Sequence, residues 1–181
     1  MTDARRPGSA RDTCYFGAGG GGGGGGAGGG SASCTDVIPM QVTGELVPMY
    51  SWTDGAVSSL TVARVANLEF IAANPTACVP QGTTPGALDE RCELAYTRSA
   101  LPSLDNPQTL PNNVSSPLMH GASPALGGGF PTEVALTNET PLENGVQYQA
   151  SVIRTLEDGN VACGCVRFNA GTSASDDDNC L

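Results

Sequence analysis

The segment at residues 141–155 constrains the fold more than any other part of the chain. It opens with the turn-forming run Pro-Leu-Glu-Asn-Gly. Apolar residues then stand at every second position, with polar residues between them: Tyr148, Ala150 and Val152 against Gln147, Gln149 and Ser151. A period of two is typical of a strand that buries one face. The segment therefore predicts a β-sheet with a hydrophobic core on one side.

Shorter patterns of the same kind recur along the chain. They predict strands at residues 37–42, 45–52, 57–65, 68–72, 132–137 and 161–169. Turn signals separate them, including Asp54-Gly55 and Asp158-Gly-Asn160. Residues 87–96 fit one or two helical turns, and residues 93–97 fit a strand equally well. Many short strands without a long helix predict a mainly β chain, folded as an antiparallel β-sandwich.

The chain divides by composition into a tail, a domain and a second tail. Residues 1–36 contain eight consecutive glycines at 19–26 and predict a disordered Gly-rich tether, because such a backbone loses much entropy on ordering and buries nothing. Residues 37–170 form the predicted domain, with a long irregular insertion at about 74–130. Residues 171–181 form an acidic C-terminal tail with three consecutive aspartates.

The cysteines favour disulfide bonds over metal binding. There are seven, none in a C-x-x-C motif, and the chain has a single histidine, so the usual ligand spacing of a zinc site is lacking. Dispersed cysteines in a small domain rich in glycine and proline fit an oxidising compartment. The disulfide candidates are Cys14, Cys34, Cys78, Cys92, Cys163, Cys165 and Cys180. An odd number leaves at least one unpaired, intermolecular or modified.

Spacing suggests some of the pairings. A disulfide between Cys78 and Cys92 would close a short loop. The motif Cys163-Gly-Cys165 places two thiols on one face of a strand, where they could meet a metal or a redox partner; the expected alternative is that one of them pairs with Cys180. The thiol of Cys14 is open to two interpretations, which are a lipid attachment and a disulfide with Cys34.

The predicted compartment is extracellular or the cell surface, although no leader is present in this chain. Residues 1–13 are polar and lack the apolar segment of a signal peptide. Three interpretations remain open: a mature or truncated form, a start further upstream, or thiols kept reduced inside a cell. We favour a missing leader, which could also supply a membrane tether. A glycine run after a cysteine resembles the stalk of bacterial surface lipoproteins, but Arg-Asp-Thr before Cys14 lacks their lipid-attachment pattern.

Charge limits the classes of partner. The formal net charge is −10, and arginine supplies all eight cations, because the chain has no lysine. A negative surface repels phosphate backbones and anionic lipid, which argues against nucleic acid and membrane surfaces. No segment approaches the roughly 20 apolar residues of a membrane span. The predicted partner is an unidentified protein or glycan, and no cofactor or metal is expected.

The turn at the start of the first segment carries a resemblance to a known family. Leu142-Glu-Asn-Gly-Val-Gln-Tyr148 resembles the tyrosine corner of fibronectin type III domains. Ser51-Trp52 and Leu60-Thr-Val62 are similar to the strand B tryptophan and to strand C of that family. The likeness covers residues 37–73 and 131–169 and extends in general style to Ig-like domains of bacterial surface proteins.

The resemblance implies structural roles for Trp52, Leu142 and Tyr148. The ring of Tyr148 would pack beneath its own turn, with its hydroxyl bound to a backbone group, and Trp52 would fill the core. A domain of this family is often a spacer or a binding module without catalytic activity. The resemblance therefore implies a scaffold, although fold alone does not fix function.

The sequence offers little catalytic chemistry. The sole histidine, His120, precedes Gly-Ala-Ser-Pro-Ala, which lacks the second glycine of a nucleophile elbow, so that His120 is expected to be a loop residue. The chain has no H-E-x-x-H motif, and without lysine it has no P-loop. We therefore expect a protein that is not an enzyme.

Three functions follow in order of preference. The first is a non-catalytic secreted or cell-surface structural or binding module. The second is a carbohydrate- or ligand-binding module that uses Tyr96 and Phe130 as exposed aromatic residues of the insertion. The third is a hydrolase whose site lies at residues 74–130, built from two carboxylates or from His120 and a serine.

Overall fold

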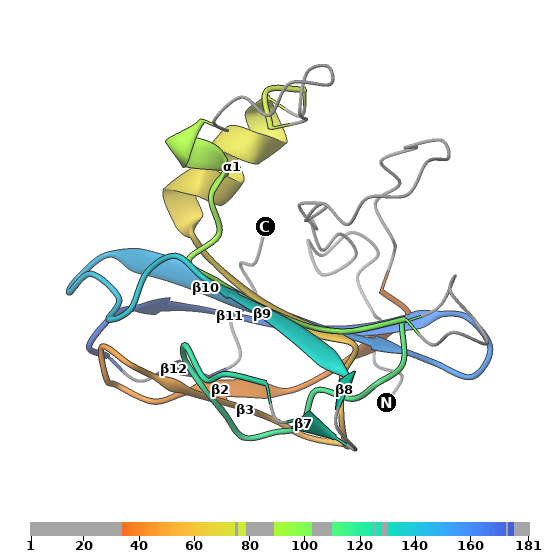
Figure 1. The fold of residues 1–181 in the computed structure, drawn as a ribbon. Coiled ribbons are helices and arrows are strands. Elements are labelled where there is room, and N and C mark those ends of the chain that lie inside the picture. Colours follow the sequence, from red (N-terminus) through yellow and green to blue (C-terminus); the bar gives the residue numbers. More distant parts are fainter. Residues whose placement is uncertain are drawn as a thin grey trace, which may run out of the picture.

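The chain folds into two β-sheets that share a core, with a short helix rising from the larger sheet (Figure 1). The computed structural model describes residues 34–74, 76–78, 89–102, 110–124, 126–127, 130–172 and 174–175. The glycine run, Cys14, Cys180, the acidic tail from 176 onward and the side chain of Phe130 lie outside this description.

The larger sheet has six strands in the order β1-β11-β10-β4-β5-β9. Their bounds are Asp36–Val37 for β1, Val161–Asn169 for β11, Gln147–Thr155 for β10, Ser59–Arg64 for β4, Tyr96–Ala100 for β5 and Glu133–Thr137 for β9. Strand β1 runs parallel to β11, and every other pair is antiparallel. The hairpin of β10 and β11 turns at the predicted position, with Gly159 at φ +82°.

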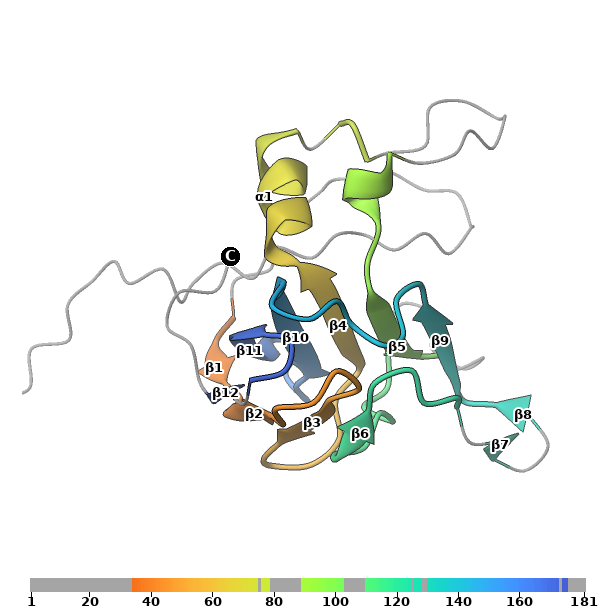
Figure 2. The same ribbon diagram turned by 90° about the vertical axis from the view of Figure 1, so that its left-hand side faces the viewer.

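The smaller sheet has four strands in the order β12-β2-β3-β6. They are Ala174–Ser175 for β12, Met40–Val42 for β2, Met49–Trp52 for β3 and Leu118–Met119 for β6. A separate pair joins β7, Leu126–Gly127, to β8, Phe130–Pro131. Figure 1 shows the two larger groups of strands as two layers, and Figure 2 shows their edges.

The core lies between the two sheets and is built from alternate residues of their strands. On β10 the predicted positions Tyr148, Ala150 and Val152 are all fully buried. Tyr50 and Trp52 project from the smaller sheet into the same cluster. The period of two therefore correctly identified the face of β10 that packs into the core.

The segment predicted as one strand at 37–42 is two strands in different sheets. Residues 36–37 pair with β11, and residues 40–42 pair with β3. Between them the chain crosses from one sheet to the other close to β11, where Ile38 N–H donates to the carbonyl of Cys163 at 2.7 Å. A Cβ on Gly164 would stand 2.2 Å from the Ile38 carbonyl oxygen, so only glycine fits at this crossing.

The strand predicted at residues 68–72 is wrong, because these residues belong to helix α1, Val65–Ala73. Val65, Leu68 and Ile71 are its buried residues, and their spacing of three is a helical period. A short apolar run fits a strand or a helix, and here the helical contacts prevail. The strand predicted at 45–52 is also too long, since β3 begins at Met49.

The described part of residues 74–130 contains regular elements, so the expectation of a wholly irregular insertion is wrong. The two alternatives left open near residue 90 are both present: a 3₁₀ helix, η2, spans Glu90–Cys92, and β5 begins at Tyr96. Strand β5 lies inside the larger sheet, and β6 belongs to the smaller one. The expected insertion thus contributes an interior strand, β5, to the larger sheet. Less of the insertion therefore lies outside the sheets than the sequence predicts.

Candidate functional site

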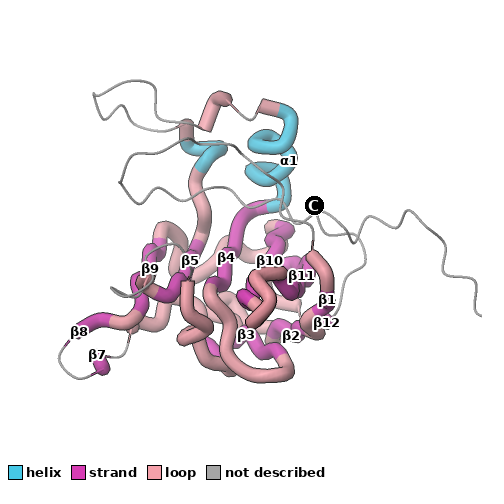
Figure 3. Tube along the Cα trace, turned by 90° about the vertical axis from the view of Figure 1, so that its right-hand side faces the viewer, coloured by secondary structure: helices cyan, strands magenta, loops and turns pink. Residues whose placement is uncertain are grey.

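The most distinctive feature of the surface is the segment between β4 and β5, residues 65–95, which we call the arm. Strands β4 and β5 are neighbours in the sheet, with Val62 opposite Tyr96. Helix α1 and η2 stand side by side beyond the ends of β4 and β5 (Figures 2 and 3). Adjacent antiparallel strands need only a few residues to join them, so the arm is an addition that the sheet does not require.

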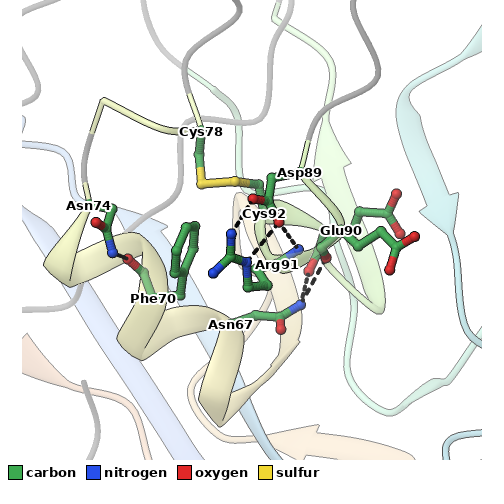
Figure 4. Close-up of a disulfide and its surroundings, with 9 residues drawn as sticks. Asn67, Phe70, Asn74, Cys78, Asp89, Glu90, Arg91 and Cys92 are labelled. Carbon is green, nitrogen blue, oxygen red and sulfur yellow. Dashed lines mark hydrogen bonds and ion pairs between the residues drawn. A yellow bond between two sulfur atoms is a disulfide. The ribbon is translucent and has the colours of Figure 1, made fainter.

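A disulfide holds the arm closed. Cys78 and Cys92 are bonded, with their Cα atoms 5.4 Å apart (Figure 4). The pairing predicted from the spacing is therefore confirmed. On the chain-entropy model, closing a loop of this size stabilises the folded state by about 3 kcal/mol. The arm thus has its own cross-link and does not depend on the core between the two sheets alone.

Arg91 locks the helix to the second half of the arm. Its guanidinium lies 3.9 Å from the centroid of the Phe70 ring, a cation–π contact (Figure 4). The same group donates to both carboxylate oxygens of Asp89, at 2.6 and 2.9 Å. Hydrogen bonds from the Arg91 side chain and backbone lower the pKa of Asp89 to about 2. Asp89 also caps η2 by accepting the Arg91 N–H.

Asn67 connects the two halves of the arm through the backbone. Its amide donates to the carbonyls of Glu93 at 3.0 Å and Glu90 at 3.4 Å. Together with the disulfide and the Arg91 stack, this contact fixes the mutual orientation of α1 and η2. The described part of the arm is therefore a preorganised unit.

The described part of the arm exposes several carboxylates. Glu69, Glu90 and Glu93 are exposed. Among the described residues of the arm, Arg91 is the sole cation, and Asp89 already engages it. A surface of this kind favours a partner with basic groups.

A second feature is a buried polar cluster around His120. The Tyr50 hydroxyl lies 2.7 Å from His120 Nδ1, and His120 Nε2 lies 2.7 Å from the Glu139 carbonyl oxygen. A carbonyl oxygen only accepts, so Nε2 carries the proton and Nδ1 accepts from Tyr50. His120 lies in a turn, as expected, but it is buried. With both nitrogens engaged, neither is placed to activate a serine.

Burial lowers the pKa of His120 below its ordinary value of 6.5, against the opposing effect of Glu139. The unfolded chain therefore binds the proton more tightly than the folded one. The resulting stabilisation is complete above pH 6.5 and is lost as the pH falls through the lower folded-state pKa.

Replacing His120 with glutamine tests this effect. Glutamine keeps one acceptor and one donor but does not titrate. We expect the free energy of unfolding to fall between about pH 7 and about pH 5 more steeply in the wild type than in His120→Gln. Urea denaturation at both pH values measures the difference, and all other groups are shared by the two proteins. Equal slopes would contradict the assignment.

Tyr148 sits at a polar corner next to this cluster. Its ring is fully buried, and its hydroxyl accepts the Glu143 N–H at 3.1 Å and donates to Glu139 at 2.6 Å. Arg64 binds both carboxylates, at 2.6 Å to Glu139 and 2.9 Å to Glu143. Burial, reinforced by the hydrogen bond to Glu139, raises the pKa of Tyr148 to about 12. The corner ties the end of β4 to the turn before β10.

The other two residues singled out by the resemblance belong to the same core. Leu142 and Trp52 are both buried, and the Trp52 indole donates to the Gly55 carbonyl at 3.0 Å. These residues and Tyr148 form part of one hydrophobic cluster.

The expectation that Tyr96 is exposed is wrong. Strand β5 lies between β4 and β9, and Tyr96 points from it into the core with no exposed surface. Its hydroxyl donates to the Ala122 carbonyl at 3.2 Å. Tyr96, Arg98 and Ala100 alternate on this buried face, but the charge of Arg98 hides the pattern in the sequence.

The N-terminal disulfide also differs from the expectation. Cys34 is bonded to Cys163, with Cα atoms 5.6 Å apart, so the proposed pairing of Cys34 with Cys14 is wrong. The parallel contact of β1 with β11 brings these two residues together. Cys165 is also disulfide-bonded. The predicted pairing with Cys180 involves a residue outside the described part of the chain.

Comparisons of the chain with protein-family models, with curated proteins and with solved structures give no match. Within the described residues, no helix is long and apolar enough to cross a membrane. The same residues contain no group of three or more His, Cys, Asp or Glu side chains arranged to hold a metal ion.

Proposed function

We propose that the protein is a secreted or cell-surface module that binds a partner through its arm and performs no catalysis. The proposal includes a β-sandwich related to fibronectin type III domains. Neighbouring strands β4, β10 and β11 support this relation, as they would correspond to strands C, F and G. The hydrogen bond from the Glu143 N–H to the Tyr148 hydroxyl supports it as well.

The arm is the observation that carries the proposal. It leaves the sheet at Arg64 and returns at Tyr96, directly beside its starting point. It is then stiffened by a disulfide, a cation–π contact and side-chain hydrogen bonds. A rigid projection costs less entropy on binding than a flexible loop does, which suits it to recognition.

The disulfides support the proposed compartment. Two of them join described residues of a small domain, a pattern typical of oxidising environments. By contrast, a glycan site built on Tyr96 loses its support, because the ring is buried. A hydrolytic site based on His120 is disfavoured by the two hydrogen bonds that hold its ring.

Two measurements test the proposal. Protein purified from its native source under alkylating, non-reducing conditions should yield peptides that link Cys34 to Cys163 and Cys78 to Cys92. Seven alkylated thiols would contradict the proposed compartment.

Binding is tested with the labelled full-length protein on intact producing cells and on their extracellular matrix. Charge reversal on the arm, Glu69→Lys with Glu90→Lys, should weaken binding at least about tenfold. The control is Glu157→Lys, which reverses one exposed carboxylate in the hairpin between β10 and β11. Equal binding by both variants, or no binding by the wild type, would contradict the role of the arm.

A further inference from the structure

The structure points to a second interaction surface, at the free edge of the larger sheet. Strand β9 is the last strand of that sheet, and none of the described residues pairs with its outer side. Figure 2 shows it at the margin of the layer, opposite β1. We propose that β9 pairs with β9 of a second copy of this chain, which joins the two large sheets across a two-fold axis at Ala135.

The alternation of hydrogen bonds between β5 and β9 leaves backbone N–H and C=O groups of β9 pointing away from the sheet, where a second strand could bond to them. Leu101 N–H donates to the Thr132 carbonyl and Asn138 N–H to that of Ala95, both in the register of β5 with β9. Antiparallel ladders alternate between bonded and non-bonded pairs. Val134 and Leu136 therefore bond to β5, while Glu133, Ala135 and Thr137 direct their N–H and C=O groups outward.

The outward-pointing backbone groups of β9 match those of a second, antiparallel β9. With Ala135 opposite Ala135 of the second copy, Glu133 stands opposite Thr137, and Thr137 opposite Glu133. Every one of these residues has outward-pointing groups, so each pair exchanges both of its hydrogen bonds. No carboxylate faces another carboxylate across the junction, and Glu133 is already neutralised by Arg98 of its own chain.

The exposed side chains of β9 suit the same arrangement. Val134 and Leu136 are 47% and 53% exposed and lie on the face of the sheet that points away from the core. In the proposed register, Val134 stands opposite Leu136 of the second copy, so that four apolar side chains meet across the axis. Exposed apolar edge strands favour such pairing unless charge or proline blocks them.

The strand is short, which sets the expected strength. A proline lies on each side of the strand, Pro131 before it and Pro141 after it. The ladder is therefore confined to the region around Glu133–Thr137. The contact is smaller than the roughly 1,600 Å² of a standard interface, and each chain has a net charge of −10. We therefore expect a weak dimer that strengthens with salt, because salt screens the repulsion between the two chains.

Sedimentation velocity of the full chain tests the proposal, over a concentration series at about 0.15 M and about 1 M salt. Three proteins are compared with the wild type. Ala135→Pro removes the central outward N–H without removing a bond to β5, because proline is tolerated where an N–H faces the edge. Leu136→Lys places a charge in the apolar seam, the contact that Val134 and Leu136 of the two copies form across the axis. Met119→Lys is the control, with 52% exposure on the edge of the other sheet.

The wild type and Met119→Lys should dimerise alike. Ala135→Pro and Leu136→Lys should raise the dissociation constant by about 10- to 100-fold. Amide exchange should also show the Ala135 N–H protected at high protein concentration. Circular dichroism and the thermal midpoint establish that Ala135→Pro remains folded, and Leu136→Lys tests the seam independently.

Several results would overturn the proposal. These are a wild type that stays monomeric throughout, a dimer unaffected by Ala135→Pro and Leu136→Lys, or a dimer lost in Met119→Lys alone. The wild type could also stay monomeric while an added extended peptide protects its Ala135 amide from exchange. This result would assign the edge to a different chain and would reject self-pairing.

Discussion

Replacing Cys34 and Cys163 together with alanine should lower the free energy of unfolding by about 5 kcal/mol. This disulfide joins residues 129 positions apart and encloses nearly all of the described fold. Without it the unfolded chain gains the entropy of a long open loop. Because a typical domain is stable by only about 5–15 kcal/mol, the variant should lose a third or more of its stability.

Urea denaturation of the oxidised proteins measures the effect, with Cys78→Ala/Cys92→Ala as the matched control. The control opens the arm, whose loop is much shorter, 14 positions instead of 129. Its urea midpoint should fall less than that of Cys34→Ala/Cys163→Ala. If Cys78→Ala/Cys92→Ala is destabilised as much as Cys34→Ala/Cys163→Ala or more, the disulfide of the arm, and not the one between Cys34 and β11, governs global stability.

Replacing Arg98 with methionine should cost about 3–5 kcal/mol. Arg98 is buried on β5, where it forms an ion pair with Glu133 and donates to the Ala122 carbonyl at 2.9 Å. Both side chains are almost completely enclosed, 6% and 14% exposed. Removing the guanidinium leaves the partly buried carboxylate of Glu133 without its cation, and the desolvation of this charge dominates the loss.

Two further variants separate this cause from a simple loss of packing. Arg98→Met/Glu133→Leu removes both charges and should recover most of the stability, since the Ala122 carbonyl still accepts from Tyr96. Arg91→Met breaks the exposed pair with Asp89 and should have a much smaller effect on the urea midpoint. A double variant no more stable than Arg98→Met would contradict the explanation.

The parts of the fold that could be predicted are those governed by local patterns. The alternation on β10 and the Asp-Gly turn after it predicted a hairpin with the strand at residues 161–169, and β10 and β11 form that hairpin. The close spacing of Cys78 and Cys92 predicted their disulfide. In each case the residues that decide the outcome lie near one another in the sequence.

The parts that failed depend on distant contacts. Helix α1 was expected as a strand because five apolar-rich residues carry no clear period. The bond of Cys34 to Cys163 follows from a parallel pairing between the two ends of the domain, which no local signal specifies. The cluster of Tyr50, His120 and Glu139 likewise draws on three separate segments.

The two ends of the arm lie on neighbouring strands, and this has a practical consequence. The chain leaves and re-enters the sheet on neighbouring strands, and the Cys78–Cys92 cross-link lies wholly within the excursion. A foreign peptide with matching end spacing could therefore be grafted at this junction while the layers beneath remain intact. The same architecture would let one framework display many different recognition tips, as engineered libraries do by randomising a single loop.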